Sequence, residues 1–312
     1  MKHRTAFAIP VLVGAAMVAH VLVPTPGPAQ GAPSGPLPTA APASPSAPSP
    51  ASPPATPSEP APSATGTTTP EQAVRLALDG LGAHRGRYAL AVEDLTSGRS
   101  AAYGSSTSST EAFTSASIVK VDILAALLLQ AQDRGEQLGS AQRQLASDMI
   151  RVSDNDAAQK LWGEIGRRQG LDAANARLGF SSAHAGQKVP WGLTRTTARD
   201  QIALLKAVFT QDSPLNAASR SYLRALMGTV SEGQNWGVGA AGTPGTPPVL
   251  KNGWLPDGTT HLWSVNSVGI VEREGHSLLV VVLTDGQPTQ ETGIGLVERV
   301  AAAAVEALVR TP

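Results

Sequence analysis

The 312-residue sequence contains no cysteine and carries no excess charge of either sign. The missing thiol excludes disulfides, zinc sites built on thiolates, a cysteine nucleophile and a membrane anchor on an acylated cysteine. Acidic and basic side chains number 24 each. Because no basic cluster with interleaved aromatics is present, the sequence lacks the electrostatic footprint of a nucleic-acid-binding protein, and we expect no nucleic-acid partner.

Several catalytic motifs are absent as well. The sequence has no Gly-x-Ser-x-Gly elbow, no His-Glu-x-x-His pair and no glycine-rich phosphate loop. The six histidines, at positions 3, 20, 84, 184, 261 and 276, form no metal-ligand spacing. We therefore expect neither a metal nor a cofactor.

Charge is scarce in the first 70 residues. A basic start (KHR) precedes an apolar run from Ala6 to Val23, and the tripeptide AQG ends at Gly31. This pattern predicts a signal peptide over residues 1–31. The alternative is an uncleaved membrane anchor, since about 18 apolar residues just span a bilayer. Both interpretations predict an extracytoplasmic protein, either secreted or tethered to the membrane or cell wall.

Proline is concentrated in a single segment. Residues 24–70 hold 16 of the 25 prolines, and Glu59 is their only charged residue. Such a composition cannot bury enough apolar surface to offset the entropy of ordering. We predict a disordered linker over residues 32–70 and one folded domain over residues 71–312.

The folded part shows strand patterns at both ends and helical patterns between them. We predict a short helix after Thr69, a hairpin at 87–95 and 99–105, and helices from about 117 to 225. Strands at 247–254, 261–271 and 276–285 and a helix at 293–309 follow. The simplest packing is a mixed α/β (α+β) fold, in which terminal helices flank a five-stranded antiparallel sheet and an all-helical lobe is inserted.

Ser117 and Lys120 lie three positions apart at the start of the aliphatic run SIVKVDILAALLLQ. On a helix this spacing places both side chains on one face, so the amine can reach the hydroxyl. A serine hydroxyl needs a base to become a nucleophile, and a desolvated lysine can be that base. The alternative is a snorkelling lysine whose amine reaches water.

Two further short motifs carry polar chemistry. Ser153-Asp154-Asn155 precedes AAQKLW and suits a helix cap, a second hydroxyl for proton transfer, or both. Lys251-Asn252-Gly253-Trp254 lies in a predicted strand, where glycine permits close approach of a ligand or another backbone. A lysine there offers a cation to a substrate carboxylate. The alternative is an edge-strand lysine beside an ordinary turn glycine.

In this order the three motifs resemble the Ser-x-x-Lys, Ser-Asp-Asn and Lys-Thr-Gly signature of class A β-lactamases and penicillin-binding proteins. The resemblance covers residues 71–312 and includes AFTSASIVK, LASDMIRVSDNDAAQKLW, GLTRTTARDQIALL and THLWSVNSVGIV. It implies the β-lactamase/transpeptidase-like fold, which agrees with the predicted element order.

The resemblance also implies catalytic roles. Ser117 would be the acylated nucleophile, Lys120 its general base, and Ser153 the relay of a proton to the leaving nitrogen. The backbone N–H groups of Ser117 and Trp254 would form the oxyanion hole.

Substrate-binding roles follow from the same resemblance. Asn155 would hold the substrate's side-chain amide, and Lys251 would supply positive potential to its carboxylate. Asn252, Gly253 and Trp254 would line the same strand. The implied substrate is a β-lactam or a peptide resembling those of peptidoglycan.

The omega loop departs from the family pattern. Class A enzymes carry a glutamate there that activates water for deacylation. The segment HAGQKVPWGLTRTTARD has no carboxylate between His184 and Asp200. Glu164 and Asp172 lie upstream in helical patterns and match no family position. We therefore expect the acyl-enzyme to form and then persist.

Three smaller departures change the expected cleft. Asn252 replaces the usual threonine, so we expect a changed role there. Trp254 replaces a small residue, so we expect its ring to reshape the cleft along the strand. Ser117 and Ser153 are only 36 positions apart, and we expect the shortening at residues 135–144 to open one wall.

Three functions fit these observations. The first is an exported serine hydrolase that β-lactams acylate and that hydrolyses them slowly. The second is a peptidoglycan-directed peptidase or acyl-transfer enzyme, and the third is a catalytically silent binding or sensor module. Nothing in the sequence indicates an oligomeric state.

Overall fold

The computed structural model describes residues 68–104, 112–180 and 189–311. The predicted signal peptide or anchor lies outside these residues, as does nearly all of the predicted linker. None of the helices in the described ranges combines the length and apolar character that crossing a bilayer requires.

A five-stranded sheet forms the centre of the domain. All of its neighbouring strands pair antiparallel, in the order β2-β1-β7-β6-β5, which confirms the predicted sheet. Strand β7 carries the run LLVVVL and is buried on both faces, which suits its central place. The strands are β1 (Arg87–Asp94), β2 (Ser100–Gly104), β5 (Val249–Pro256), β6 (Trp263–Arg273) and β7 (His276–Gln287).

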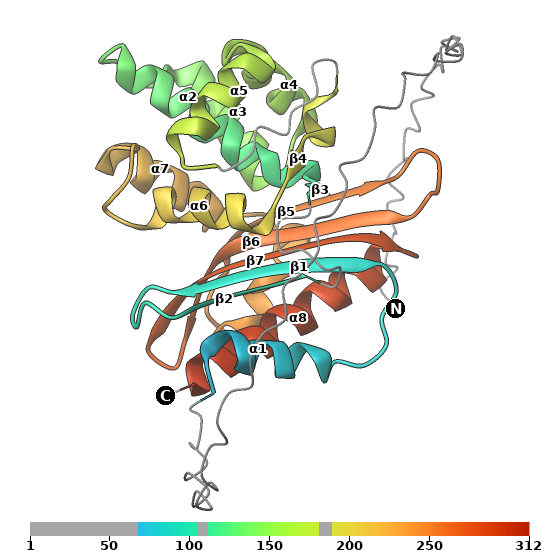
Figure 1. Cartoon of the computed structure of the whole chain (residues 1–312). Coiled ribbons are helices and arrows are strands. Elements are labelled where there is room, and N and C mark those ends of the chain that lie inside the picture. The colour runs from blue at the N-terminus through green and yellow to red at the C-terminus, as the bar shows by residue number, and fades with distance from the viewer. Residues whose placement is uncertain (1–67, 105–111, 181–188, 312) are drawn as a thin grey trace, which may run out of the picture. The chain divides into compact units, whose positions relative to one another are not determined.

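The two terminal helices cover one face of this sheet (Figure 1). They are α1 (Pro70–Asp79) and α8 (Gln290–Arg310). The Thr69 side chain caps α1 and Thr289 caps α8, each in a reciprocal capping box. The apolar stripe of α8 packs against alternate residues of the central strands, including Leu90 and Val280. Strand alternation thereby divides the core into two clusters, one on each face.

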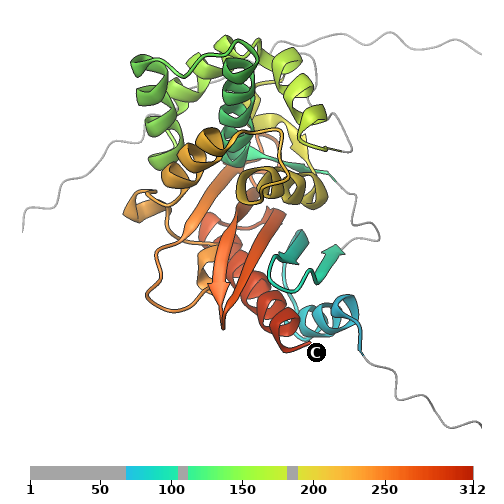
Figure 2. The same cartoon turned by 90° about the vertical axis from the view of Figure 1, so that its left-hand side faces the viewer.

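The helical lobe covers the opposite face (Figure 2). At its centre, α2 is buried on nearly every side, because VKVDILAALLLQ has almost no polar face. Residues 134–139 join α2 to α3, a short connection. The helices are α2 (Val119–Asp133), α3 (Ser140–Arg151), α4 (Asn155–Glu164), α5 (Arg167–Arg177), α6 (Ala198–Phe209) and α7 (Ala217–Met227).

Several short elements were not predicted. A two-stranded sheet joins β3 (Phe113–Thr114) to β4 (Arg195–Thr196), and it ties the segment before Ser117 to the segment before α6. Two-residue strands are too short to show a period in sequence. The 3-10 turns are η1 (Ala116–Ile118), η2 (Trp191–Leu193), η3 (Glu232–Gln234) and η4 (Val238–Ala241).

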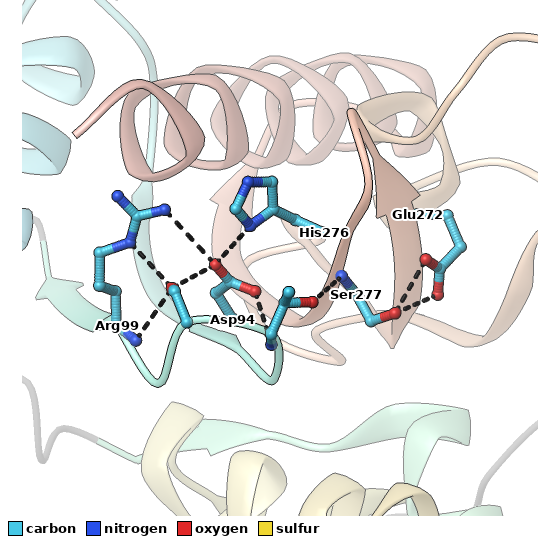
Figure 3. A network of polar contacts seen from close by, with 7 residues as sticks. Asp94, Arg99, Glu272, His276 and Ser277 are labelled. Carbon is cyan, nitrogen blue, oxygen red and sulfur yellow. Dashed lines mark hydrogen bonds and ion pairs between the residues drawn. The ribbon is translucent and has the colours of Figure 1, made fainter. Parts of the chain in front are cut away.

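A polar network holds two strand turns together at one end of the sheet (Figure 3). The fully buried Asp94 accepts a hydrogen bond from Thr96 N at 2.9 Å and lies 2.8 Å from Nδ1 of His276. Ser277 Oγ donates to the Glu272 carboxylate at 2.7 Å. Asp94, the last residue of β1, therefore connects the turn after β1 to the start of β7.

Candidate active site

Ser117 lies in the tight turn η1, directly before α2. The side chain is half-buried, and the preceding Ala116 adopts a left-handed conformation with φ of +48°. Such a conformation is costly for a residue with a Cβ and is found mainly where surrounding structure imposes it, often at functional sites. The turn therefore presents Ser117 at the N-terminal end of a buried helix.

Lys120 is fully buried, although its amine is polar. Its Nζ donates to Ser153 O at 2.6 Å, to Ser153 Oγ at 3.0 Å and to Asn155 Oδ1 at 2.8 Å. The snorkelling alternative is therefore wrong, because the amine does not reach water. No hydrogen bond joins Lys120 to Ser117 within the described residues, and catalytic bonds of this kind often tighten only when substrate binds.

Ser153 connects the two lysines of the motifs. Its Oγ lies 3.0 Å from Lys120 Nζ and 3.0 Å from Lys251 Nζ. Its backbone is left-handed, with φ of +59°. The neighbouring Asp154 caps α4 by accepting from Ala157 N at 2.6 Å. Asp154 thus performs the capping, which leaves the Ser153 hydroxyl to the lysines.

Burial and mutual repulsion favour neutral amines at this site. Burial lowers the pKa of Lys120 to about 8, and the negative charge of Asp154 opposes this shift. Burial, together with the charge of Lys120, lowers the pKa of Lys251 well below its ordinary value. Two lysines that share one hydroxyl are unfavourable when both are protonated.

The hydrogen-bond partners decide where a neutral Lys120 would direct its lone pair. Ser153 O and Asn155 Oδ1 can only accept, so they occupy the two N–H groups of the neutral amine. Among its described hydrogen-bond partners, the Ser153 hydroxyl at 3.0 Å is the one that can donate to the lone pair. This arrangement lets Lys120 take a proton from a serine.

Strand β5 approaches the serine turn closely at Gly253. A Cβ at this position would lie 2.6 Å from Ser117 N, 2.7 Å from Ile118 N and 3.0 Å from Ser115 O. Only glycine fits, and of the two approaches that the motif allowed, the one seen here is that of another backbone, the turn that contains Ser117. The buried Asn266 anchors this turn by donating to Ser115 O at 3.1 Å. The N–H of Ser117 therefore lies beside β5, where the oxyanion hole is expected.

The Asn252 side chain lies elsewhere than expected. Along β5, Lys251 and Gly253 face the serine turn, so Asn252 faces the opposite side of the sheet. Asn252 is buried, and its amide donates to Gln234 O at 2.9 Å and to Trp236 O at 2.8 Å. As a correction, its side chain holds the 234–236 segment and has no amide hydrogen left for a substrate.

The Trp254 ring also packs away from the serine turn. It meets the Trp236 ring edge-on at 5.7 Å between centroids and belongs to the cluster under α8. The expectation that this ring reshapes the cleft was wrong, because strand alternation directs it to the other face. Its backbone N–H remains the predicted second donor of the oxyanion hole.

Two contributors escaped the sequence reasoning. The ring of Trp191, on η2, lies 4.8 Å from Lys120 Nζ. Asn266, on β6, is fully buried and fixes the serine turn to the sheet through Thr114 O and Ser115 O. No local pattern marks either residue, because both contacts join segments far apart in the chain.

The described part of the predicted omega-loop segment, from residue 189 to residue 199, contains no carboxylate. Residues 181–188 lie outside the described ranges. Glu164 accepts a hydrogen bond from Gln142, and Asp172 pairs with Arg168 at 3.0 Å. Neither carboxylate is hydrogen-bonded to Ser117, and no group of His, Asp or Glu in the described ranges could hold a metal ion.

A buried carboxyl lies on α2 two residues after Lys120. Asp122 accepts a hydrogen bond from Gln201 Nε2 at 3.3 Å. Burial raises the pKa of Asp122 to about 8 from its ordinary value of 3.8, and the charge of Asp200 contributes. Between these two values the folded chain binds more protons than the unfolded chain, so the free energy of unfolding falls as pH rises through this window.

We expect Asp122→Asn to remove this pH dependence. The amide keeps the size and acceptor of the carboxyl but never has to bury a charge. The Tm of the variant should match the wild type near about pH 5 and exceed it near about pH 9. Asp156→Asn, a change to an exposed residue on α4, is the control. Equal pH dependence of Tm in all three proteins would contradict this account.

Solved structures with the same fold are numerous. They include the class A beta-lactamase from Bacteroides cellulosilyticus DSM 14838, with a TM-score of 0.65 and 16% identity over 77% of this chain and 98% of that chain. A class A beta-lactamase from Mycobacterium abscessus has a TM-score of 0.62 and 18% identity over 77% of this chain and 100% of that chain. A mutant of PBP-A in acyl-enzyme complex with penicillin G has a TM-score of 0.62 and 19% identity over 76% of this chain and 96% of that chain. At these identities the likeness shows the fold.

Comparison of the sequence with known families identifies the family. No curated protein matches it significantly. The family model described as the beta-lactamase enzyme family matches residues 138–308, which is more than half of the chain and includes Ser153 and Lys251. With the five-stranded sheet and the inserted helical lobe, this match shows that the chain belongs to the beta-lactamase enzyme family.

Proposed function

We propose that the chain is an exported serine hydrolase of the class A β-lactamase-like family, acylated on Ser117 by β-lactams and slow to deacylate. The observation that carries the proposal is the convergence of Lys120 and Lys251 on Ser153 Oγ, each at 3.0 Å, beside the serine turn. Burying two amines is costly, and a pocket that only binds has no physical need for both. The proposed reaction uses Lys120 as the base and Lys251 as a partner for the substrate carboxylate.

The geometry supports a route to acylation. Neutral Lys120 takes the proton of Ser117, whose Oγ forms a bond to the β-lactam carbonyl carbon. The N–H groups of Ser117 and Trp254 stabilise the oxyanion. When the tetrahedral intermediate collapses, the carbon–nitrogen bond breaks and Ser153 gives its proton to the leaving nitrogen. Ser153 Oγ regains a proton from the protonated Lys120 Nζ, 3.0 Å away, which returns both side chains to their starting protonation states.

Substrate binding uses the exposed and cationic groups of the same site. Asn155 is exposed, and Lys120 occupies only its Oδ1, so its amide hydrogens can meet a substrate carbonyl. Lys251 is buried behind Ser153, and the negative charge of a bound substrate carboxylate would favour its protonated form, which then supplies positive potential to that carboxylate. Gly253 lets the serine turn approach β5, which places the N–H of Ser117 beside the strand.

Slow deacylation rests on a missing base. Hydrolysis of the acyl ester requires a group that takes a proton from the attacking water. Residues 189–199 offer no carboxylate, and the partners of Glu164 and Asp172 lie elsewhere. The acyl-enzyme complex of the structurally similar PBP-A mutant with penicillin G supports the formation of such an adduct in this fold.

Pre-steady-state hydrolysis of a chromogenic cephalosporin tests the proposal. We expect a burst close to one product per enzyme, because acylation outruns deacylation, followed by a slow steady rate. Fast linear turnover without a burst would contradict slow deacylation. No burst and no turnover would contradict acylation and favour a binding module.

Export is the remaining part of the proposal. The basic start and the apolar run before Gly31 support a signal peptide, and the proline-rich segment supports a tether. The N-terminal residue of the protein recovered from the culture medium or cell envelope decides between cleavage after residue 31 and an uncleaved anchor.

A further inference from the structure

The amine of Lys120 has a fourth neighbour besides its three hydrogen-bond acceptors. The Trp191 ring lies 4.8 Å from Nζ, within the range of a cation–π contact. Ser153 O, Ser153 Oγ and Asn155 Oδ1 take the hydrogens of the ammonium. The indole therefore covers a side of the amine that water would otherwise contact.

Trp191 is held in place from the serine turn itself. Its carbonyl accepts from Thr194 N at 3.2 Å, which closes η2. Ser115 N donates to Thr194 O at 2.8 Å, and the hydroxyls of Ser115 and Thr194 lie 2.7 Å apart. Pairing of Phe113 with Thr196 extends the same connection. The ring and the nucleophile thus belong to one hydrogen-bonded unit.

The charged groups facing Lys120 in the described part of the chain are Asp154 and Lys251. Turn η2 itself adds no charge, since it consists of Trp, Gly and Leu. Arg195 follows, but its guanidinium bonds to Thr114 and Ala112. The contribution of η2 to Lys120 is therefore the indole ring and the exclusion of water.

We propose that Trp191 is a positioning residue that holds the Lys120 amine dry beside Ser117 and denies a hydrolytic water the place beside that amine. This inference rests on the proposed function, and it assigns both fast acylation and slow deacylation to one side chain.

The chemistry of deacylation shows why the position matters. Water must lose a proton to a base while its oxygen bonds to the acyl carbon, and the Ser117 Oγ–carbon bond then breaks as Oγ is reprotonated. Lys120 is the proposed base for Ser117, and the Trp191 ring covers the side of its amine that the three acceptors leave open. Removing the ring opens a place where a water can contact Lys120 and attack the ester.

Three substitutions separate the ring's effects. Trp191→Ala admits water, which hydrates the ammonium and raises the pKa of Lys120 toward its ordinary value. Each unit of that rise lowers the neutral fraction at neutral pH, and with it acylation, about tenfold. At a pH above the raised pKa, where Lys120 is neutral in both proteins, the same variant should deacylate at least several times faster. Trp191→Phe keeps an aromatic face, so its acylation and deacylation rates should stay close to those of the wild type. Trp191→Leu keeps an apolar cover over the amine but does not attract a cation, so the pH midpoint of its acylation should not rise.

The experiment measures acylation by benzylpenicillin against pH and loss of the adduct by intact mass, in the wild type and the three variants. Trp263→Ala, at a half-buried tryptophan in the cluster under α8, is the control. The expected result is a higher pH midpoint and faster adduct loss in Trp191→Ala alone. An unchanged midpoint and adduct lifetime in Trp191→Ala, or a Phe variant that behaves as the Ala variant does, would overturn the inference.

A second readout does not depend on acylation. NMR titration of the lysine side chains, of which the chain has six, gives the pKa of Lys120 directly. A rise in Trp191→Ala and none in Trp191→Phe supports the inference, and equal values in all variants contradict it. A wild type that penicillin does not acylate would instead contradict the proposed function, so the two failures are distinguishable.

Discussion

Ser117→Ala should abolish covalent labelling by penicillin while leaving the fold intact. The hydroxyl is the atom that forms the acyl bond, so no residual rate is expected from this position. Alanine fits the half-buried turn without new contacts, and no described hydrogen bond of Ser117 Oγ is lost. Labelling with a fluorescent penicillin, read on a denaturing gel, checks the result.

The matched control is Ser140→Ala, at an exposed serine on α3. It should label as the wild type does, and the Tm of both variants should stay within a few degrees of the wild type. Labelling that survives in Ser117→Ala would mean that another residue carries the acyl group, and the assignment of the nucleophile would fail.

Lys120→Met should slow acylation by about 10²–10⁴-fold, the usual contribution of a general base. Methionine keeps most of the length and apolar stem of the lysine, so the loss is mainly that of the amine. Lys120 makes three hydrogen bonds, and their loss should also lower Tm. The acylation rate is therefore measured well below the Tm of the variant, with Lys160→Met, at an exposed lysine on α4, as the control.

The pH dependence of the wild type belongs to the same prediction. Lys120 accepts a proton only when neutral, and burial lowers its pKa to about 8. The acylation rate should rise with pH and level off above about that value. In Lys120→Met this rising limb should disappear. An unchanged rate and profile in the variant would show that Lys120 is not the base.

The sheet and the lobe were predictable because their patterns are long. The run LLVVVL on β7 and the aliphatic α2 predict buried elements from hydrophobicity alone. The spacing of Ser117 and Lys120 led us to expect a shared helical face, but Ser117 lies in a 3-10 turn before the helix and no described hydrogen bond joins the two side chains.

The side-chain directions on β5 show where the sequence reasoning failed although the information was present. Once Lys251 is assigned to the cleft, the two-residue period of a strand directs Asn252 and Trp254 to the other face. The contact of Trp191 with Lys120, unlike the side-chain directions on β5, could not be derived from the sequence. It depends on how η2 packs against the serine turn, which hydrogen bonds of Ser115 and Thr194 determine, and no local pattern encodes that packing.

The most direct test of the account is the intact mass of the purified protein after mixing with benzylpenicillin, followed over hours. The account predicts one penicilloyl adduct per chain, mapped to Ser117, that forms quickly and persists while little hydrolysed drug accumulates. An adduct that vanishes as hydrolysed drug accumulates would contradict slow deacylation, and the absence of any adduct would contradict the acyl-enzyme itself.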